Sequence, residues 1–239
     1  MTAVLLGCGR SGGPPVPRPD RSDGALPTLR VPRCGRASLG SAPRLGGLVD
    51  PGTGRPRPGS NVQGDGSFCY DDEGLHLGVD VYDPRPEAPF DPASLDPHIW
   101  ERSTGVELML EPHAEGLNQG YFELQVDRRG AVWSTRFDGY NRPISRGADG
   151  QLRFGHQDWQ PALSVQTRDL AGGRGFRVEL TVRWADLDLG AGPLRPSPGA
   201  VWRANVYTFR DGQRDSLAWS PILGQGNFHR ASRWGRLQF

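Results

Sequence analysis

The densest group of side chains that could contact a ligand lies near the C-terminus, between Ser216 and Arg230. Gln225 and Asn227 supply amide groups there, and a glycine on each side of Gln225 permits backbone conformations closed to other residues. Phe228 follows on the same predicted loop. Connecting segments normally lie at the surface, so this ring either folds inward as a plug or is offered to a ligand. The stretch predicts a short strand followed by a binding-type loop.

Templates for catalysis fit the sequence poorly. It has no serine in a G-x-S-x-G turn, no H-E-x-x-H pair and no glycine-rich phosphate loop between a strand and a helix. The five histidines lack metal-ligand spacing, which argues against zinc. Glu107 and Glu123, on neighbouring predicted strands, could form a carboxylate pair or simply accept hydrogen bonds from ligand hydroxyls.

A calcium loop is a weaker interpretation of the acids at residues 71–73. They lack the spaced oxygen ligands and the distal glutamate of such a loop, so a solvated turn is favoured. No cofactor is predicted with certainty, and calcium stays open.

Alternating apolar and polar residues predict strands over most of the chain. The strongest pattern runs from Phe176 to Trp184, and Leu75 to Tyr82 forms a hairpin with residues 67–70 across an acidic turn. No segment shows a sustained helical stripe. The fold class is therefore all-β, an antiparallel β-sandwich. The remaining predicted strands are 26–34, at an edge, then 106–110, 121–126, 131–137, 202–209 and 233–239.

Length and charge limit the choice of partners. With 239 residues, of which 36% are hydrophobic, the chain can bury one sizeable core. The formal net charge is +1 with both signs interspersed, so nucleic acid is not expected as a partner. No run of 18 apolar residues could span a membrane as a helix. We expect one domain, residues 29–239, after an extended leader.

The leader suggests export. Leu5-Leu6-Gly7-Cys8 resembles the cleavage box of bacterial lipoproteins, in which the cysteine is lipidated, although the basic and apolar parts of a full signal are missing. Either the start codon is placed too late or the match is accidental. Residues 1–8 are thus a truncated signal-like start, and the proline-rich residues 9–28 are predicted to be a disordered tether.

Two cysteines remain if Cys8 carries a lipid. Cys34 and Cys69 could pair in an exported protein, or could be two small buried apolar residues on neighbouring strands. Both interpretations stay open at this stage.

A succession of motifs resembles the family-9 carbohydrate-binding modules and the related DOMON-like, jelly-roll sandwiches. It covers roughly residues 60–239 and rests on the order of the motifs, since each alone is weak. The segments are Asp96-Pro97-His98-Ile99-Trp100, Val106 to Leu110, Tyr121 to Val126, Trp202 to Tyr207, Trp219-Ser220-Pro221, Asn227-Phe228-His229 and Trp234 to Leu237.

The resemblance implies a sugar held between two aromatic rings at Trp100 and Phe228. The family's polar ligands would fall on Glu107, Gln125, Asp127 and either Gln225 or Asn227. Three differences from the family are visible. Phe228 stands where a tryptophan is typical, one extra residue separates Trp100 from Glu107, and the opening D-G-x-x-D-E-x-x-W element is absent near residues 38–50.

The sequence thus predicts a non-catalytic module that binds a mono- or oligosaccharide at the cell envelope, as a monomer, with the membrane reached only through the lipid anchor. Two alternatives follow from the same resemblance: an accessory module that supports polysaccharide hydrolysis, and a haem-binding redox module. The second would need an axial ligand such as Met109, which the strand pattern places in the core.

Overall fold

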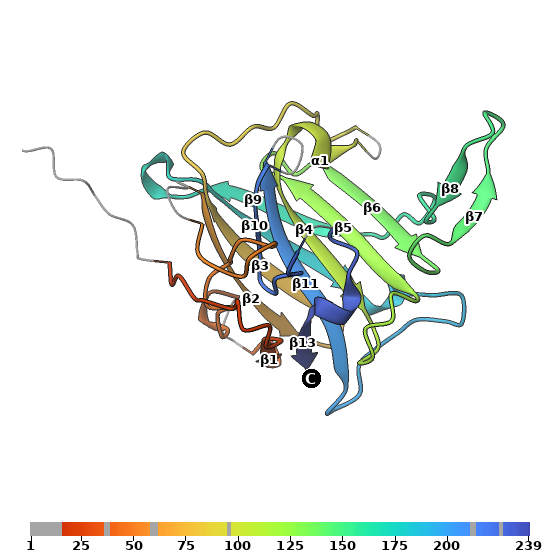
Figure 1. Ribbon diagram of the computed structural model, residues 1–239, viewed down its shortest axis with the longest axis horizontal. Helices are drawn as coiled ribbons and strands as arrows, with labels where there is room; N and C mark the ends of the chain where they lie inside the picture. The colour runs from red at the N-terminus through yellow and green to blue at the C-terminus, as the bar shows by residue number, and fades with distance from the viewer. Residues whose placement is uncertain (1–15, 36–38, 58–61, 95–96, 211–213, 225–226) are drawn as a thin grey trace, which may run out of the picture.

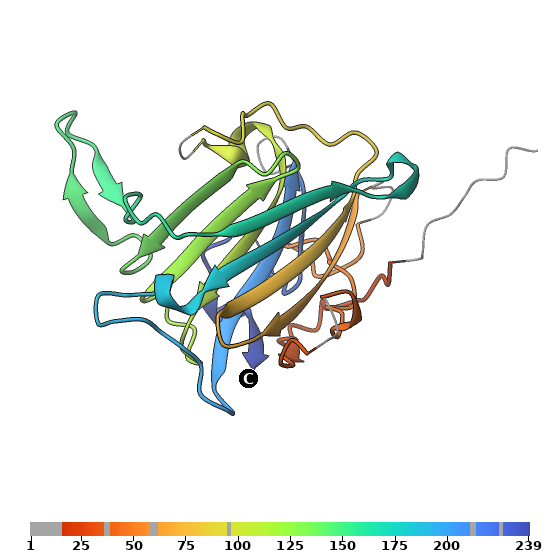
Figure 2. The same cartoon turned by 180° about the vertical axis from the view of Figure 1, so that it is seen from behind.

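A computed structural model of the protein describes residues 16–35, 39–57, 62–94, 97–210, 214–224 and 227–239. Figure 1 shows two β-sheets packed face to face, and Figure 2 shows the same body from behind. Helix is limited to one turn, α1 (Ile99–Arg102), and short 3-10 turns in the described part of the chain. The prediction of an all-β sandwich is confirmed.

The larger sheet has seven strands in the order β1-β13-β11-β4-β5-β6, with β12 also paired to β11. Apart from the parallel pair β1 and β13, neighbouring strands in this sheet are antiparallel. The bounds are β1 Thr28–Arg30, β4 Thr104–Glu111, β5 Tyr121–Asp127, β6 Val132–Phe137, β11 Val201–Arg210, β12 Arg214–Ala218 and β13 Gly235–Gln238.

The smaller sheet has four antiparallel strands in the order β2-β3-β10-β9. These strands are β2 Gln63–Tyr70, β3 Gly74–Tyr82, β9 Ser164–Asp169 and β10 Phe176–Arg183. A separate hairpin, β7 Pro143–Arg146 with β8 Leu152–Phe154, projects from the sandwich as an arm in both views. The sequence patterns predicted neither this arm nor β9.

The main core lies between the two sheets. Strict alternation turns one face of each strand inward, so Leu77 and Val79 of β3 meet Leu108 of β4 and Val206 of β11 in one buried cluster. This burial fixes the register, because a slip of one residue would move polar side chains such as Glu107 into the apolar layer.

Part of the leader is ordered against the domain, which corrects the prediction of a disordered tether for residues 16–28. Arg21 donates to the carbonyl oxygens of Gly47 (2.8 Å) and Leu45 (3.0 Å), and Arg233 donates to that of Gly24 (2.9 Å). Arginine can satisfy several carbonyls at once, so a proline-rich segment is held without a core of its own. Residues 1–15, including Cys8, lie outside the described residues.

Cys34 and Cys69 form a disulfide across 35 residues, which joins the segment after β1 to strand β2. The pairing alternative is therefore the correct one. Within the described residues, no helix is long and apolar enough to cross a membrane.

Candidate functional site

The outer face of the larger sheet, turned away from the main core, carries polar and aromatic side chains in rows. One row crosses four strands through Tyr207, Glu107, Gln125 and Trp133, which are register partners from β11 to β6. Segments at two places cover this face. The C-terminal loop packs Phe228 and Trp234 on it, and the segment around α1 packs Ile99 against Trp133 and Phe209.

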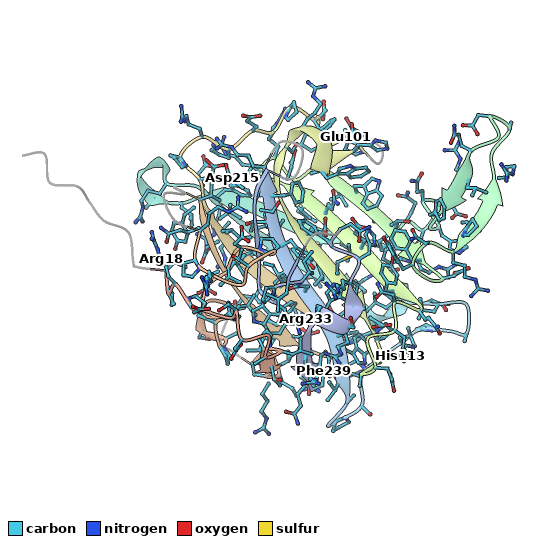
Figure 3. All side chains as sticks on the ribbon, viewed as in Figure 1. Arg18, Glu101, His113, Asp215, Arg233 and Phe239 are labelled. Atoms are coloured by element: carbon cyan, nitrogen blue, oxygen red, sulfur yellow. A yellow bond between two sulfur atoms is a disulfide. The ribbon has the colours of Figure 1, made fainter. Side chains whose placement is uncertain are left out.

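The C-terminal loop is held to the sheet by buried hydrogen bonds. The amide of Asn205, fully buried on β11, accepts from the Ser220 backbone N–H (2.9 Å) and donates to the Ser220 carbonyl (2.8 Å). Ser220 in turn donates its hydroxyl to the carbonyl of Arg233 (2.6 Å), the residue labelled in Figure 3 beside the loop. The Asn205 amide thus holds Ser220, and the Ser220 hydroxyl connects this residue to Arg233 at the other end of the loop.

Phe228 belongs to the core beneath this loop. Its ring is 7% exposed and stacks on Tyr207 with a centroid distance of 3.9 Å and an interplanar angle of 4°. Its carbonyl accepts from the Tyr207 hydroxyl (3.1 Å) and the Trp234 indole (2.9 Å). The expectation of a sugar-stacking ring at Phe228 is therefore corrected: the ring is the plug, because its apolar faces are already buried.

His229, the next residue, contacts the outer face of the sheet at Tyr121 and Glu123 of β5. Tyr121 hydroxyl and His229 Nδ1 are 2.8 Å apart, and His229 Nε2 lies 3.5 Å from Glu123 Oε2. A tautomer with the proton on Nε2 satisfies both contacts, with Tyr121 donating to Nδ1. Tyr140 adds a near-parallel ring at 5.8 Å and accepts from the side-chain amide of Asn227 (2.7 Å).

A pocket of about 310 Å³ opens between the two covering segments. Trp100 of α1 and Trp133 of β6 form one aromatic corner, with ring centroids 4.8 Å apart at 72°. The lining residues are Trp100, Glu123, Gln125, Trp133, Phe137, Gln157 and His229. Aromatic walls with a few polar groups on the floor are typical of a site for an amphipathic small ligand.

The floor is built on the side chain of Gln125. Its Nε2 donates to Glu107 Oε2 and to Glu123 Oε1, both at 2.8 Å, so one amide bridges two carboxyl groups. Glu107 is fully buried behind Gln125, whereas Glu123 and Gln125 line the pocket itself. The acids stand on adjacent strands, where alternation points both toward the same face.

Burial makes the neutral forms of these groups the stable ones. It raises the pKa of Glu123 to about 8, and burial together with the nearby Glu123 charge raises the pKa of Glu107 well above its usual range. Burial also lowers the pKa of His229 to about 4. At neutral pH the contact between His229 and Glu123 therefore joins two uncharged groups rather than an ion pair.

The other predicted site residues are distributed as follows. Trp100 and Gln125 line the pocket, and Glu107 lies directly behind Gln125. Asn227 is exposed and donates to the Tyr140 hydroxyl, and Gln225 lies outside the described residues.

Asp127 has a structural task, which corrects its assignment as a sugar ligand. It is fully buried at the end of β5 and accepts from the backbone N–H groups of Arg129 (2.8 Å) and Ala131 (3.0 Å) and from Ser103 Oγ (3.3 Å). A carboxylate that closes a turn in this way has its oxygens occupied.

Sequence reasoning missed Trp133, Phe137, Gln157 and His229 as pocket residues. Strand alternation could have found two of them. Trp133 is the register partner of Gln125 and Phe137 is that of Tyr121, so both face the same side as the predicted Gln125. No local signal places Gln157, which reaches the pocket from the loop that returns from the β7–β8 arm.

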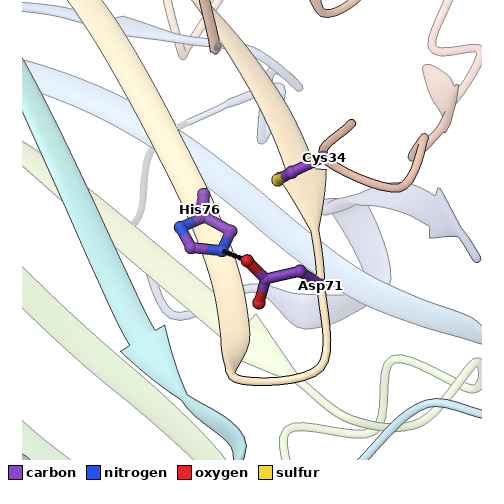
Figure 4. A group of neighbouring side chains, drawn as sticks. All are labelled: Cys34, Asp71 and His76. Atoms are coloured by element: carbon purple, nitrogen blue, oxygen red, sulfur yellow. Dashed lines mark ion pairs between the residues drawn. The ribbon is translucent and has the colours of Figure 1, made fainter. Parts of the chain in front are cut away.

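One other group of side chains in the described part of the chain could hold a metal: Cys34, Asp71 and His76 (Figure 4). Cys34 is bonded to Cys69, so its sulfur is not a thiolate ligand in this state. Asp71 pairs with His76 Nε2 (2.9 Å) and accepts from the backbone N–H groups of Glu73 and Gly74. Asp72 contacts Arg33 and Arg195. The side chains of Asp71 and Asp72 are thus engaged by the chain.

A larger hollow, of about 450 Å³, lies beside the leader and is lined by Ser22, Asp50, Thr53, Arg55, Pro56 and Arg57. None of its described lining residues is aromatic, and Arg57 is already paired with Asp50 (2.6 Å) and Asp215 (3.3 Å). Met109, the candidate haem ligand, is fully buried in the cluster under the C-terminal loop, where no axial bond could reach it without unpacking Tyr207 and Trp234.

No family model and no curated protein matches this sequence. Solved structures do resemble it. One is a Bacteroides uniformis ATCC 8492 protein provisionally named as carbohydrate-binding, with 15% identity, a TM-score of 0.66 and coverage of 90% of this chain and 100% of that one.

The second is a family-9 carbohydrate-binding module from Caldicellulosiruptor kristjanssonii. In complex with cellotriose it matches with 12% identity, a TM-score of 0.56 and coverage of 88% of this chain and 92% of that one. In complex with glucose it matches with 12% identity, a TM-score of 0.52 and coverage of 88% of this chain and 94% of that one. The fold is that of a family-9 carbohydrate-binding module. The resemblance predicted from the motifs is confirmed for the fold, although the identities are low.

The raised pKa of Glu123 predicts that this family-9-like sandwich loses stability at alkaline pH. Between the unfolded value of 4.5 and the folded value of about 8, the folded state holds the extra proton, so the free energy of unfolding falls as pH rises. The lowered pKa of His229 acts oppositely, but only between about 4 and 6.5. From pH 6.5 to 8.5 the Glu123 contribution is a loss of about 2 kcal/mol.

Urea denaturation at pH 6.5, 7.5 and 8.5 measures this loss. Glu123→Gln should reduce the fall in the free energy of unfolding between pH 6.5 and 8.5. The double variant Glu107→Gln with Glu123→Gln should remove the contribution of both acids to that fall. Glu115→Gln, at an exposed position, is the matched control and should behave like the wild type. An equally steep decline in Glu123→Gln would show that Glu123 titrates normally.

Proposed function

We propose that the protein is a non-catalytic carbohydrate-binding module whose ligand enters the pocket lined by Trp100, Gln125 and His229. The observation that carries this proposal is the pairing of aromatic walls with a floor of buried amide and carboxyl groups. A pyranose has apolar C–H faces and a polar rim, and this pocket offers a counterpart to each. The sugar complexes of the structurally similar family-9 module support the proposal.

In this proposal the sugar ring lies against the indole of Trp100, with Trp133 and Phe137 completing the aromatic wall. Its hydroxyls meet Gln125, Glu123 and His229. Gln125 Oε1 is buried and has no hydrogen-bond partner in the chain. The second aromatic surface therefore comes from the wall of the sheet rather than from Phe228, which stays in the core.

Replacing Trp100 by Ala should weaken binding by about 1 to 3 kcal/mol, because the stacking ring is lost. Folding should persist, since Trp100 is only partly buried and packs beside the small cluster rather than within the main core. Isothermal titration calorimetry with glucose and cellotriose measures the affinity, and thermal melting checks the fold.

Phe154→Ala is the matched control. Phe154 is a partly exposed aromatic (41%) on the β7–β8 arm and does not line the pocket, so affinity should stay at the wild-type value. If the folded wild type binds no mono- or oligosaccharide at millimolar concentration, the proposed function is wrong. If Trp100→Ala unfolds the protein, Trp100 is a core residue.

We expect no glycosidase activity. Hydrolysis needs two carboxyl groups that flank the bond to be cleaved. Here Glu107 is fully buried behind Gln125 and only Glu123 lines the pocket, so one sugar cannot meet both acids. Incubation with aryl glycosides and polysaccharides at several pH values should give no release of product. Turnover that disappears in both Glu107→Gln and Glu123→Gln would contradict the binding-only function.

An exported, lipid-anchored protein is proposed from the leader and the disulfide. Disulfides persist in oxidising compartments, and the Cys34–Cys69 bond supports export. Lipidation would occur at Cys8, and mass spectrometry of the native N-terminus tests it. A diacylglyceryl-modified Cys8 is expected at the mature terminus. An unmodified Met1 on protein recovered from the cytoplasm would eliminate the anchor.

A further inference from the structure

The floor of the pocket is rich in hydrogen-bond acceptors that the chain leaves without donors. Glu107 Oε1 and Gln125 Oε1 are buried and have no hydrogen-bond partner, while the Gln125 amide nitrogen already serves two carboxyls. A buried acceptor that lacks a donor destabilises the fold. Such a site favours a ligand that brings donors and few acceptors.

Neighbouring donors are directed elsewhere. The Tyr207 hydroxyl and the Trp234 indole both donate to the Phe228 carbonyl, and the Tyr121 hydroxyl contacts His229 Nδ1. None of the residues that line the pocket in the described ranges is an arginine, and this chain contains no lysine. The acceptors of the floor therefore have no protein cation to meet.

The other buried acids of the described chain show what this floor lacks. Asp65 is paired with Arg44 (3.0 Å), and Asp83 lies 3.4 Å from Arg210. Glu111 accepts from two backbone N–H groups, and so does Asp127. Glu107 and Glu123 have only the shared amide of Gln125 and a neutral imidazole. Without such partners the buried carboxylate form is unfavourable, so the acid stays protonated until a cation reaches it from outside.

We propose that the preferred ligand is an amino sugar with a free amino group, whose ammonium lies on the floor against Glu123 and the Gln125 Oε1 oxygen. This inference rests on the proposed function and specifies its ligand class. An ammonium offers three donors and no acceptor, which matches the acceptor-rich floor. Its hydrogen bonds to a carboxylate are stronger than those of a neutral hydroxyl, and the faces of Trp100 and Trp133 also attract a cation.

Binding of the ammonium should displace one proton. In the free protein Glu123, with its pKa raised to about 8, is protonated at pH 6.5, and a cation beside it favours the carboxylate. The titratable groups that face it are Glu107 from β4, Tyr207 from β11, Tyr121 from β5 and His229 from the C-terminal loop. The two tyrosines have raised pKa values and His229 a lowered one, so these three stay neutral. The proton leaves from the Glu107–Gln125–Glu123 row to solvent.

Calorimetry with D-glucosamine, D-glucose and N-acetyl-D-glucosamine at pH 6.5 tests the inference. Each titration is run in two buffers that differ in ionisation enthalpy, because the difference in measured heat reports the protons released. D-Glucosamine should bind about tenfold more tightly than the other two, which is the gain expected from one charge-assisted contact. Close to one proton should be released with D-glucosamine and none with D-glucose.

Glu123→Gln should bring the ratio of the D-glucosamine and D-glucose affinities close to one and abolish proton release. Glu101→Gln, an exposed acid on the same helix as Trp100, removes a negative charge near the pocket without touching the floor and should keep the ratio. If Glu123→Gln fails to fold, the wild-type protein still tests the inference. It should release a proton when it binds D-glucosamine and none when it binds D-glucose.

The outcomes separate the two proposals. If D-glucose binds and D-glucosamine binds no more tightly, the amino-sugar inference is wrong and the proposed function stands. A tenfold preference that survives in Glu123→Gln, or that appears without proton release, also overturns it. If none of the three sugars and no oligosaccharide binds to the folded protein, the proposed function itself fails.

Discussion

One amide side chain carries the arrangement of the pocket. Gln125 supplies the donors for two buried carboxyl groups, and its place on β5, opposite Glu107 on β4 and Trp133 on β6, follows from the register of the sheet. Because the main core lies on the other face, the register cannot slip without exposing Leu124 and Val126. The apolar layer between the sheets thus fixes the polar row on the outside, even though none of its residues contacts the pocket.

Hydrogen bonds hold the described residues of the C-terminal loop against the sheet. Asn205 holds Ser220, Tyr207 and Trp234 hold the carbonyl of Phe228, and Asn118 holds both His229 and Ala231 through its amide. Burial of Phe228 is part of this restraint, since its ring anchors the loop and thereby sets the direction of His229. A ring that is buried in this way has no free face on which a sugar could stack. Phe228 therefore cannot fill the core and bind a sugar at the same time.

Alternation along the chain was sufficient to predict the sandwich, because β3, β4, β5, β10 and β11 each bury a continuous apolar stripe. It failed for β9, an edge strand with no fully buried residue, whose sequence Ser164–Asp169 has only half-buried Val165 as an apolar member. The lining of the pocket was predictable where strand period and motif agreed, as at Trp100 and Gln125. It was not where side chains served the backbone, as Asp127 does, or where burial depended on a distant partner, as for Phe228 on Tyr207.

The two acids beneath the pocket are unfavourable for the folded state taken alone. Burying an ionisable group without charged or backbone partners is unfavourable, and each of the other buried acids in the described part of the chain is matched by arginine or backbone donors. The unmatched pair therefore lowers the stability of the free protein at the pocket that we propose binds the ligand. A ligand that supplies the missing donors binds only the folded state and stabilises it by mass action. The hydrogen bonds that the free protein lacks then contribute to the affinity for the ligand.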